Sequence, residues 1–99
     1  MFARVSNYEI GDAPALVAGF ERATGPLEEM GGFAGAYFLL SQDAGKAISI
    51  TLWDDEESLN AGVEKANELQ RNAVAEGGGS ITSVDHYEVA LTAGPVAAR

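Results

Sequence analysis

The stretch Ile48-Ser49-Ile50-Thr51-Leu52-Trp53-Asp54-Asp55-Glu56-Glu57-Ser58-Leu59 decides the fold of this 99-residue chain. Its first five residues alternate between apolar and polar side chains, a period of two that places one apolar set on one face of a β-strand. β-Branched side chains predominate there, as a packed, pleated surface favours. The acidic residues that follow Trp53 favour the first turn of a helix, because negative charge is stabilised at that end of the helix dipole. The stretch therefore predicts a strand that leads directly into a helix.

The predicted helix runs from about residue 55 to residue 76. Asp54 is placed to accept hydrogen bonds from the amides of the first turn, and Glu57 lies three residues further on, at the spacing of a capping box. A run of three glycines, residues 77–79, ends the helix. Apolar residues recur along it at helical spacing: Leu59, Val63, Ala66, Ala73 and Val74.

The other elements follow from the same patterns. Asp12-Ala13-Pro14 starts a helix, and Gly25-Pro26 inside its apolar stripe is expected to kink or briefly interrupt it. The predicted order is a strand at 2–10, a helix from about 13 to 30, a strand at 33–41, a hairpin turn at 42–45, the strand and helix described above, a strand at 80–91, and a tail at 92–99.

This β-α-β-β-α-β order predicts one α+β domain over residues 1–91 with a ferredoxin-like fold. Right-handed crossovers place both helices on one face of a four-stranded antiparallel sheet. The strand at 33–41 is apolar on both sides, and the chain has no third helix for the second face of the sheet. An apolar sheet face of that size is an association surface. We therefore expect a homodimer in which two sheets pack face to face.

Composition excludes several classes of site and partner. The chain has no cysteine and one histidine, so it cannot supply a thiol nucleophile, a thiolate zinc site or a His₂ metal centre, and we expect no metal. A net charge of −9 repels nucleic acids and anionic membranes. No stretch approaches the roughly 20 apolar residues of a membrane span. The N-terminus enters a strand without signal-peptide organisation, so we expect a cytoplasmic protein.

Three segments together resemble a known family. These are Phe2-Ala3-Arg4, Gly31-Gly32-Phe33, and Ile50-Thr51-Leu52-Trp53-Asp54 followed by Glu57-Ser58-Leu59. They are similar to the antibiotic biosynthesis monooxygenase group of the dimeric α/β-barrel superfamily, over residues 2–91. The resemblance implies a dimer whose sheets form a barrel, with a pocket between each sheet and its helices. Some members oxidise polycyclic phenols to quinones without metal or flavin, others degrade haem, and many have no known activity.

The resemblance also implies candidate site residues. Asn7, Trp53 and Tyr37 match in type the asparagine, tryptophan and tyrosine that hold a phenolate in the quinone-forming branch, where neutral donors stabilise an oxyanion. No cofactor is expected for that chemistry. The haem-degrading branch needs a tryptophan and a histidine on the second helix, where this chain has Gly62 and Asn72. Haem degradation is therefore not expected.

A general base is the remaining requirement, and His86 is the candidate as the only histidine. Glu88 lies two residues on, and hence on the same strand face, where it is placed to orient or charge the imidazole. Phe20 and Tyr37 are candidate substrate-binding aromatics. Each candidate also has a structural interpretation: Trp53, Phe20 and Tyr37 as packed side chains, and His86 as one of a solvated pair.

Two functions remain open. One is a cofactor-independent monooxygenase for aromatic or polyketide-like substrates, with Asn7, Trp53 and His86 as catalytic residues. The other is a non-catalytic dimeric module that binds a small hydrophobic ligand or holds a partner. Pocket volume separates them: a cleft of about 300 Å³ or more with Asn7 and Trp53 at its wall favours a ligand. Aromatic side chains that fill this space would exclude an aromatic substrate.

Overall fold

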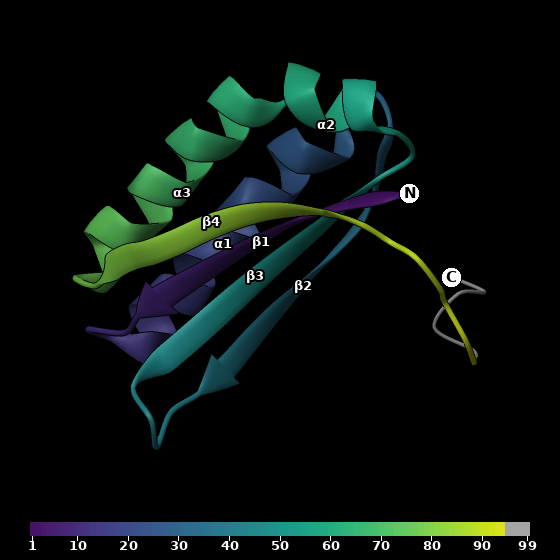
Figure 1. Cartoon of the computed structure of the whole chain (residues 1–99). Coiled ribbons are helices and arrows are strands. Elements are labelled where there is room, and N and C mark those ends of the chain that lie inside the picture. The colour runs from purple at the N-terminus through teal and green to yellow at the C-terminus, as the bar shows by residue number, and fades with distance from the viewer. Residues whose placement is uncertain (95–99) are drawn as a thin grey trace.

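The strands lie side by side in the order β2-β3-β1-β4, all antiparallel, and the helices lie on one face of this sheet (Figure 1). This arrangement, seen in a computed structural model that describes residues 1–94, confirms the predicted ferredoxin-like α+β fold. The predicted tail falls partly on residues 95–99, which lie outside the described residues. The strands are β1 (Phe2–Glu9), β2 (Phe33–Ser41), β3 (Lys46–Trp53) and β4 (Ser80–Glu88), and the helices are α1 (Ala13–Glu28), α2 (Glu56–Ala61) and α3 (Val63–Gly77).

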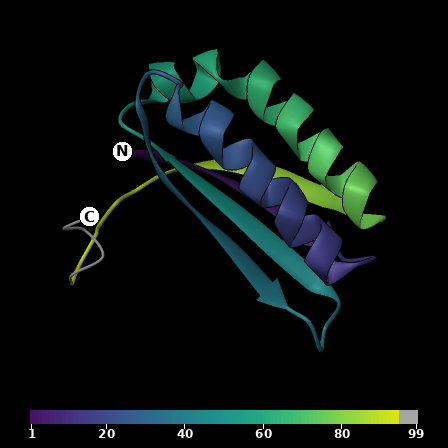
Figure 2. The same ribbon diagram turned by 180° about the vertical axis from the view of Figure 1, so that it is seen from behind.

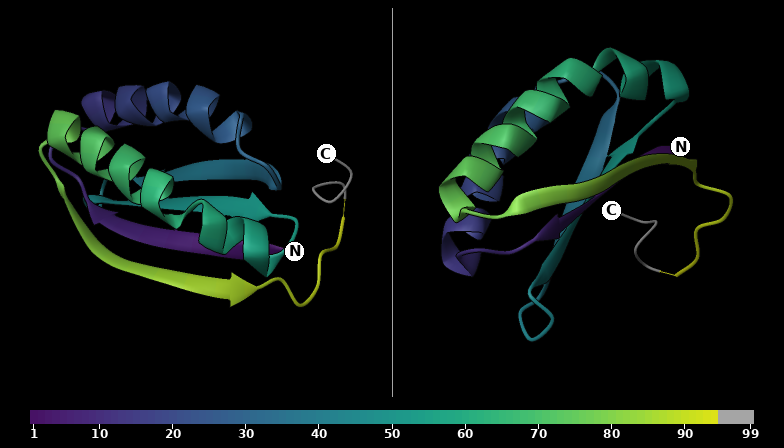
Figure 3. Two further views of the ribbon diagram at one scale, coloured as in Figure 1. Left: turned by 90° about the horizontal axis from the view of Figure 1, so that it is seen from above. Right: turned by 60° about the vertical axis from the view of Figure 1, so that its left-hand side comes forward.

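The core lies between the sheet and the helices in two apolar clusters. In one, Phe20 of α1 stacks on Phe38 of β2 with ring centroids 4.6 Å apart, and it meets Tyr8 of β1 edge-on at 5.4 Å. In the other, Trp53 is 1% exposed and packs with Leu27 and its neighbours. Figure 2 shows α1 and α3 side by side across this face, and Figure 3 shows the sheet curving beneath them. These contacts fix the spacing between sheet and helices.

The prediction of one continuous second helix is wrong, because Gly62 divides this segment into α2 and α3. Gly62 lies directly against the Trp53 ring: a Cβ atom at this position would come within 3.1 Å of the indole and 2.7 Å of the Met30 methyl group. The N-cap is Asp55 rather than the predicted Asp54. The Asp55 carboxylate accepts a hydrogen bond from the Ser58 amide at 2.8 Å, and this bond lowers the pKa of Asp55.

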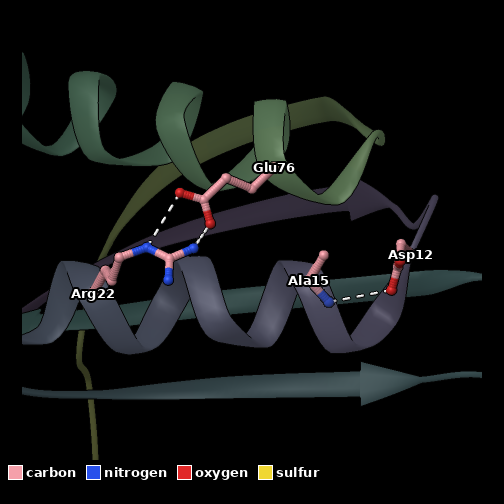
Figure 4. A network of polar contacts seen from close by, with 4 residues as sticks. All are labelled: Asp12, Ala15, Arg22 and Glu76. Carbon is pink, nitrogen blue, oxygen red and sulfur yellow. Dashed lines mark hydrogen bonds and ion pairs between the residues drawn. The ribbon is translucent and has the colours of Figure 1, made fainter.

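The first helix starts as predicted but is not interrupted. Asp12 caps it by accepting a hydrogen bond from the Ala15 amide at 3.2 Å (Figure 4). Helix α1 then runs through Pro26 to Glu28. Pro26 lies in the last turn, so few intrahelical hydrogen bonds follow the one that it removes. Figure 4 also shows the ion pair between Arg22 and Glu76, which connects α1 to α3.

Strand β4 ends at Glu88, earlier than the predicted residue 91. The ladder with its partner β1 ends at the pair Phe2 and Glu88, and the Val89 amide donates to the Met1 carbonyl at 2.9 Å just beyond it. The ladder is also irregular between Asn7 and Tyr8, where β4 shifts its register. This irregularity places Val84 opposite Ser6, on the side that faces the helices.

The opposite side of the sheet, here called the outer face, is uncovered by any helix of residues 1–94. The exposed fractions of Tyr37, Leu39 and Tyr87 on this side are 40%, 44% and 54%. Strand pairing aligns further apolar side chains with them, namely Ala3, Val5, Ile48, Ile50 and Leu52. The predicted bare apolar face is therefore present in the single chain.

Candidate functional site

A narrow cleft lies between the sheet and the helices, with two chemically different walls. One wall is apolar and includes Phe20, Leu27, Phe38 and Leu69. The other is polar and includes Arg4, Ser6, Tyr8, Ser49, Thr51 and Gln70. The free volume is about 30 Å³, enough for one or two water molecules. An aromatic ligand therefore needs side chains of the cleft to move.

The centre of the polar wall is Arg4, which is only 4% exposed. Its Nη2 donates hydrogen bonds to the Asn67 side-chain oxygen and, at 2.7 Å, to that of Gln70. Its Nη1 donates to Nε2 of His86 at 3.2 Å. The Nε–H group has no acceptor among residues 1–94. Every partner of this buried cation is thus a neutral group.

A chain of hydrogen bonds continues from Arg4 across the sheet. The Gln70 amide nitrogen donates to the Ser6 hydroxyl and, at 2.9 Å, to the Tyr8 hydroxyl. The Tyr8 hydroxyl lies 2.8 Å from that of Ser49, to which it is free to donate. Ser6 is fully buried and Tyr8 is 2% exposed. Buried hydroxyl and amide groups require such partners, so these side chains form one connected polar network.

Burial lowers the pKa of Arg4, while Tyr8 acts in the opposite direction. An arginine nevertheless stays protonated in proteins. The ion pairs formed within residues 1–94 join Arg22 to Glu76 and Lys65 to Glu68, and neither involves Arg4. A buried charge without an opposite charge is costly. Its presence in a chain with 15 acidic residues is the least expected feature of the site.

His86 is held neutral by this arrangement. Arginine can only donate hydrogen bonds, so Nε2 of His86 must carry a lone pair, and its proton must lie on Nδ1. Burial lowers the pKa of His86, the Arg4 charge lowers it further, and Asp85 partly opposes both. The partner that orients the imidazole is thus Arg4, and not Glu88 as the sequence indicated. A neutral imidazole is the form that accepts a proton.

The candidate residues named from the sequence fall on opposite sides of the sheet. Phe20, Trp53 and His86 lie on the side of the helices, whereas Asn7 and Tyr37 lie on the outer face. Trp53 Nε1 already donates to the Thr51 hydroxyl at 3.1 Å. A single chain therefore does not bring Asn7 and Trp53 to one wall. Their roles stay predictions.

Asn7 instead borders a second hollow, an open groove of about 480 Å³ near the β2–β3 hairpin. Its amide nitrogen donates to the Ser83 hydroxyl at 3.1 Å. Leu39 and Ile48 line the same groove beside it. The larger of these two hollows thus lies at the hairpin end of the sheet, with Asn7, Leu39 and Ile48 of the outer face in its wall.

Sequence reasoning placed Arg4 only in a family motif and missed the network, although a signal was present. Arg4, Ser6 and Tyr8 follow one another at a spacing of two on β1, so they share a sheet face. Asn67 and Gln70 are three residues apart and share a helix face. What the sequence did not show is that these two polar rows face each other across the core.

Two further observations concern metals and membranes. In the part of the chain that the structure describes, no three histidine, aspartate or glutamate side chains gather as metal ligands would. No helix within residues 1–94 combines the length and the apolar character needed to cross a bilayer.

Comparisons with known proteins support the fold. No protein-family model matches the sequence, and no curated protein matches it. Among solved structures, SnoaB from Streptomyces nogalater, described as a cofactor-independent oxygenase, aligns with a TM-score of 0.71 and 15% identity over 92% of this chain and 94% of that one. The heme-degrader MhuD from Mycobacterium tuberculosis, with two hemes bound in its active site, aligns with a TM-score of 0.74 and 21% identity over 95% and 100%.

A third structure, from Bordetella bronchiseptica, carries the name of an antibiotic biosynthesis monooxygenase. It aligns with a TM-score of 0.70 and 14% identity over 91% of this chain and 97% of that one. The three likenesses confirm the predicted resemblance at the level of the fold. Two of these structures are described by different chemistry, so the fold does not select an activity.

Proposed function

We propose that this protein is a small cofactor-independent monooxygenase that acts on an aromatic, polyketide-like substrate in the cleft between sheet and helices. The observation that carries the proposal is the pair of unlike walls, with Phe20 and Phe38 on one and the Arg4–Gln70 network on the other. A flat ring with oxygen substituents has the same two-sided chemistry. The likeness in fold to SnoaB, described as a cofactor-independent oxygenase, supports the class of reaction.

Substrate binding requires the cleft to widen beyond its volume of about 30 Å³. Two of the residues that line the cleft on the helix side, Leu69 and Gln70, come from α3. The chain enters α3 at Gly62, where the second helical segment is already divided. We propose that α3 moves to widen the cleft. The hydrogen bonds that the Gln70 side chain makes to the sheet would then break, and polar substituents of the ligand would replace them.

The proposed reaction uses the chain's own polar groups. His86 is neutral, and it accepts the phenolic proton at Nε2 once the Arg4 Nη1–H group turns from Nε2 to the phenolic oxygen; the positive charge of Arg4 then favours the resulting oxyanion. The anion gives electrons to O₂, after which one oxygen atom enters the ring and the other leaves as water. Phe20 supplies the apolar wall. Asn7 and Tyr37 face the other side of the sheet, so they would serve a ligand held between two sheets.

The proposal is tested by measuring the oxygen that the purified protein consumes when an anthrone is added. We expect consumption of one O₂ per quinone formed, and a loss of rate of about a hundredfold in His86→Gln, since the base is removed. Glu88→Gln is the matched control on the same strand and should keep the rate. Anthrone binding without oxygen uptake would contradict the enzyme and favour the second function, a non-catalytic ligand-binding module.

We also propose that the protein is a homodimer whose outer faces pack together. The support is the row of exposed apolar side chains Tyr37, Leu39 and Tyr87, together with their strand neighbours. Apolar patches of this kind are normally covered in a stable protein. A second copy is the partner that fits, because β-sheets with a matching apolar face pack against each other at ordinary interior density.

A further inference from the structure

The proposed function uses the charge of Arg4, but it does not explain why this buried cation has only neutral partners within residues 1–94. Burying a cation is costly unless a counter-ion or a full set of hydrogen bonds stabilises it. Arg4 has neither: its partners are two amide oxygens and an imidazole, and its Nε–H has no acceptor within residues 1–94. An arginine in this condition is suited to an anion that binds from outside.

The free Nε–H determines how such an anion binds. A carboxylate binds a guanidinium most strongly when its two oxygens accept from Nε–H and from the nitrogen on the same edge. That edge here is formed by Nε, which is free, and Nη2, which bonds to Asn67 and Gln70. One carboxylate oxygen would fill the empty position, and the other would replace a neutral amide oxygen.

The surroundings favour one carboxylate over a more highly charged group. Arg4 is the only cationic residue that lines the cavity as described over residues 1–94. His86 lies beside it but is neutral, so it does not add a second positive charge. The opposite wall is aromatic, with Phe20 and Phe38 stacked on each other. A flat aromatic acid matches both walls, whereas a phosphate would lack further cationic partners.

We propose that the cleft selects aromatic molecules that carry a carboxylate, and that Arg4 binds this carboxylate side-on. The proposal rests on the proposed function only for the location of the ligand, and it names the chemical class that the site takes. Arg4 is thereby a specificity-determining residue: it distinguishes an acid from its neutral analogue of the same shape.

Calorimetric titration with naphthoate and naphthamide tests the proposal, because the two molecules share a ring and differ in charge. On the unaltered protein we expect naphthoate to bind about tenfold or more tightly, the gain typical of a hydrogen bond to a charged group. Equal affinities would overturn the anion selectivity while leaving an aromatic cleft in place. Failure of both molecules to bind would overturn the cleft itself, and with it the proposed function.

Variants then assign the selectivity to one residue. Arg4→Met keeps an unbranched apolar stem and removes the charged guanidinium, and it should abolish the preference for naphthoate. Arg71→Met removes an exposed charge from α3 and should leave the preference unchanged. Preference that survives in Arg4→Met would overturn the assignment to Arg4. Should Arg4→Met fail to fold, the pair of molecules on the unaltered protein still decides whether the cleft selects an anion.

Discussion

The contact between Arg4 and His86 couples the charge of the cleft to the protonation of a single imidazole. Nε2 of His86 accepts from Arg4 at 3.2 Å, so a proton at Nε2 would break this hydrogen bond and place two cations side by side. Burial and Arg4 both lower the pKa of His86 from its ordinary value of 6.5. The imidazole is therefore neutral at pH 7, and its Nε2 can act as a base only when Arg4 donates to another acceptor.

Because His86 is the only histidine, its titration can be followed as one imidazole signal by NMR. We expect a midpoint below 6.5 in the folded protein. Arg4→Met should move it upward but not to 6.5, since burial is the larger cause of the shift. Glu88→Gln should leave it in place. A midpoint at or above 6.5 in the unaltered protein would contradict the Arg4–His86 contact.

The same shift gives the sign of a pH effect on stability. The unfolded chain binds a proton at His86 near pH 6.5, whereas the folded chain binds it only at lower pH. Between these two values the unfolded state holds more protons, so the free energy of unfolding falls as the pH falls. The contribution of His86 to stability is thus complete above pH 6.5 and is lost below it.

Helices α1 and α3 approach each other closely at Gly19. A Cβ atom added there would lie 2.8 Å from the Cα atom of Ala73, which is backbone and cannot turn aside as a flexible side chain would. The close approach sets the position of α3 over the sheet, and with it the distance from Gln70 to Ser6 and Tyr8. The geometry of the cleft thus depends on two small residues outside it.

Gly19→Ala is therefore expected to destabilise the protein by about 1–3 kcal/mol, although alanine is the better helix former. The reason is that the added methyl group pushes α3 away from α1. Urea unfolding followed by circular dichroism measures the change. Glu21→Ala is the control at an exposed position of the same helix, with an expected change within about 0.5 kcal/mol. A Gly19→Ala variant as stable as the parent would show that the helices are not in close contact.

For the molecule as a whole, the open question is what covers the outer face. The helices bury one side of the sheet, and residues 1–94 leave Tyr37, Leu39 and Tyr87 exposed on the other. A domain of this size buries a limited core, so an additional apolar interface contributes substantially to its stability. The proposed dimer explains why such a face is tolerated.

Leu39→Glu places a charge on the proposed interface and should shift the protein from dimer to monomer in sedimentation velocity at micromolar concentration. Leu40→Glu is the matched control, because Leu40 is the next residue on β2 and pairs with Ala47 on the opposite sheet face. We expect it to remain a dimer. The dimer would be ruled out by an unaltered protein that sediments as a stable monomer.

Several features of this chain follow from local sequence. The alternation in β3, the cap at Asp12 and the hairpin turn before Lys46 each depend on neighbouring residues, and the structure reproduces them. The break at Gly62 does not. It occurs where Gly62 lies against the Trp53 ring, a contact between residues nine positions apart in the sequence, which helical periodicity alone does not reveal.

The amino-acid sequence by itself determined the element order, the single sheet with helices on one face, and the apolar outer face. Hydrophobic periodicity and end signals act over a few residues, and these features need no more. Only the tertiary structure decided that Arg4 lies buried opposite Asn67 and Gln70, that His86 bonds to Arg4, and that Asn7 and Trp53 are on opposite sides of the sheet. Strand register and the packing of α3 bring together residues more than 60 positions apart, and the chemistry of the site arises from that juxtaposition.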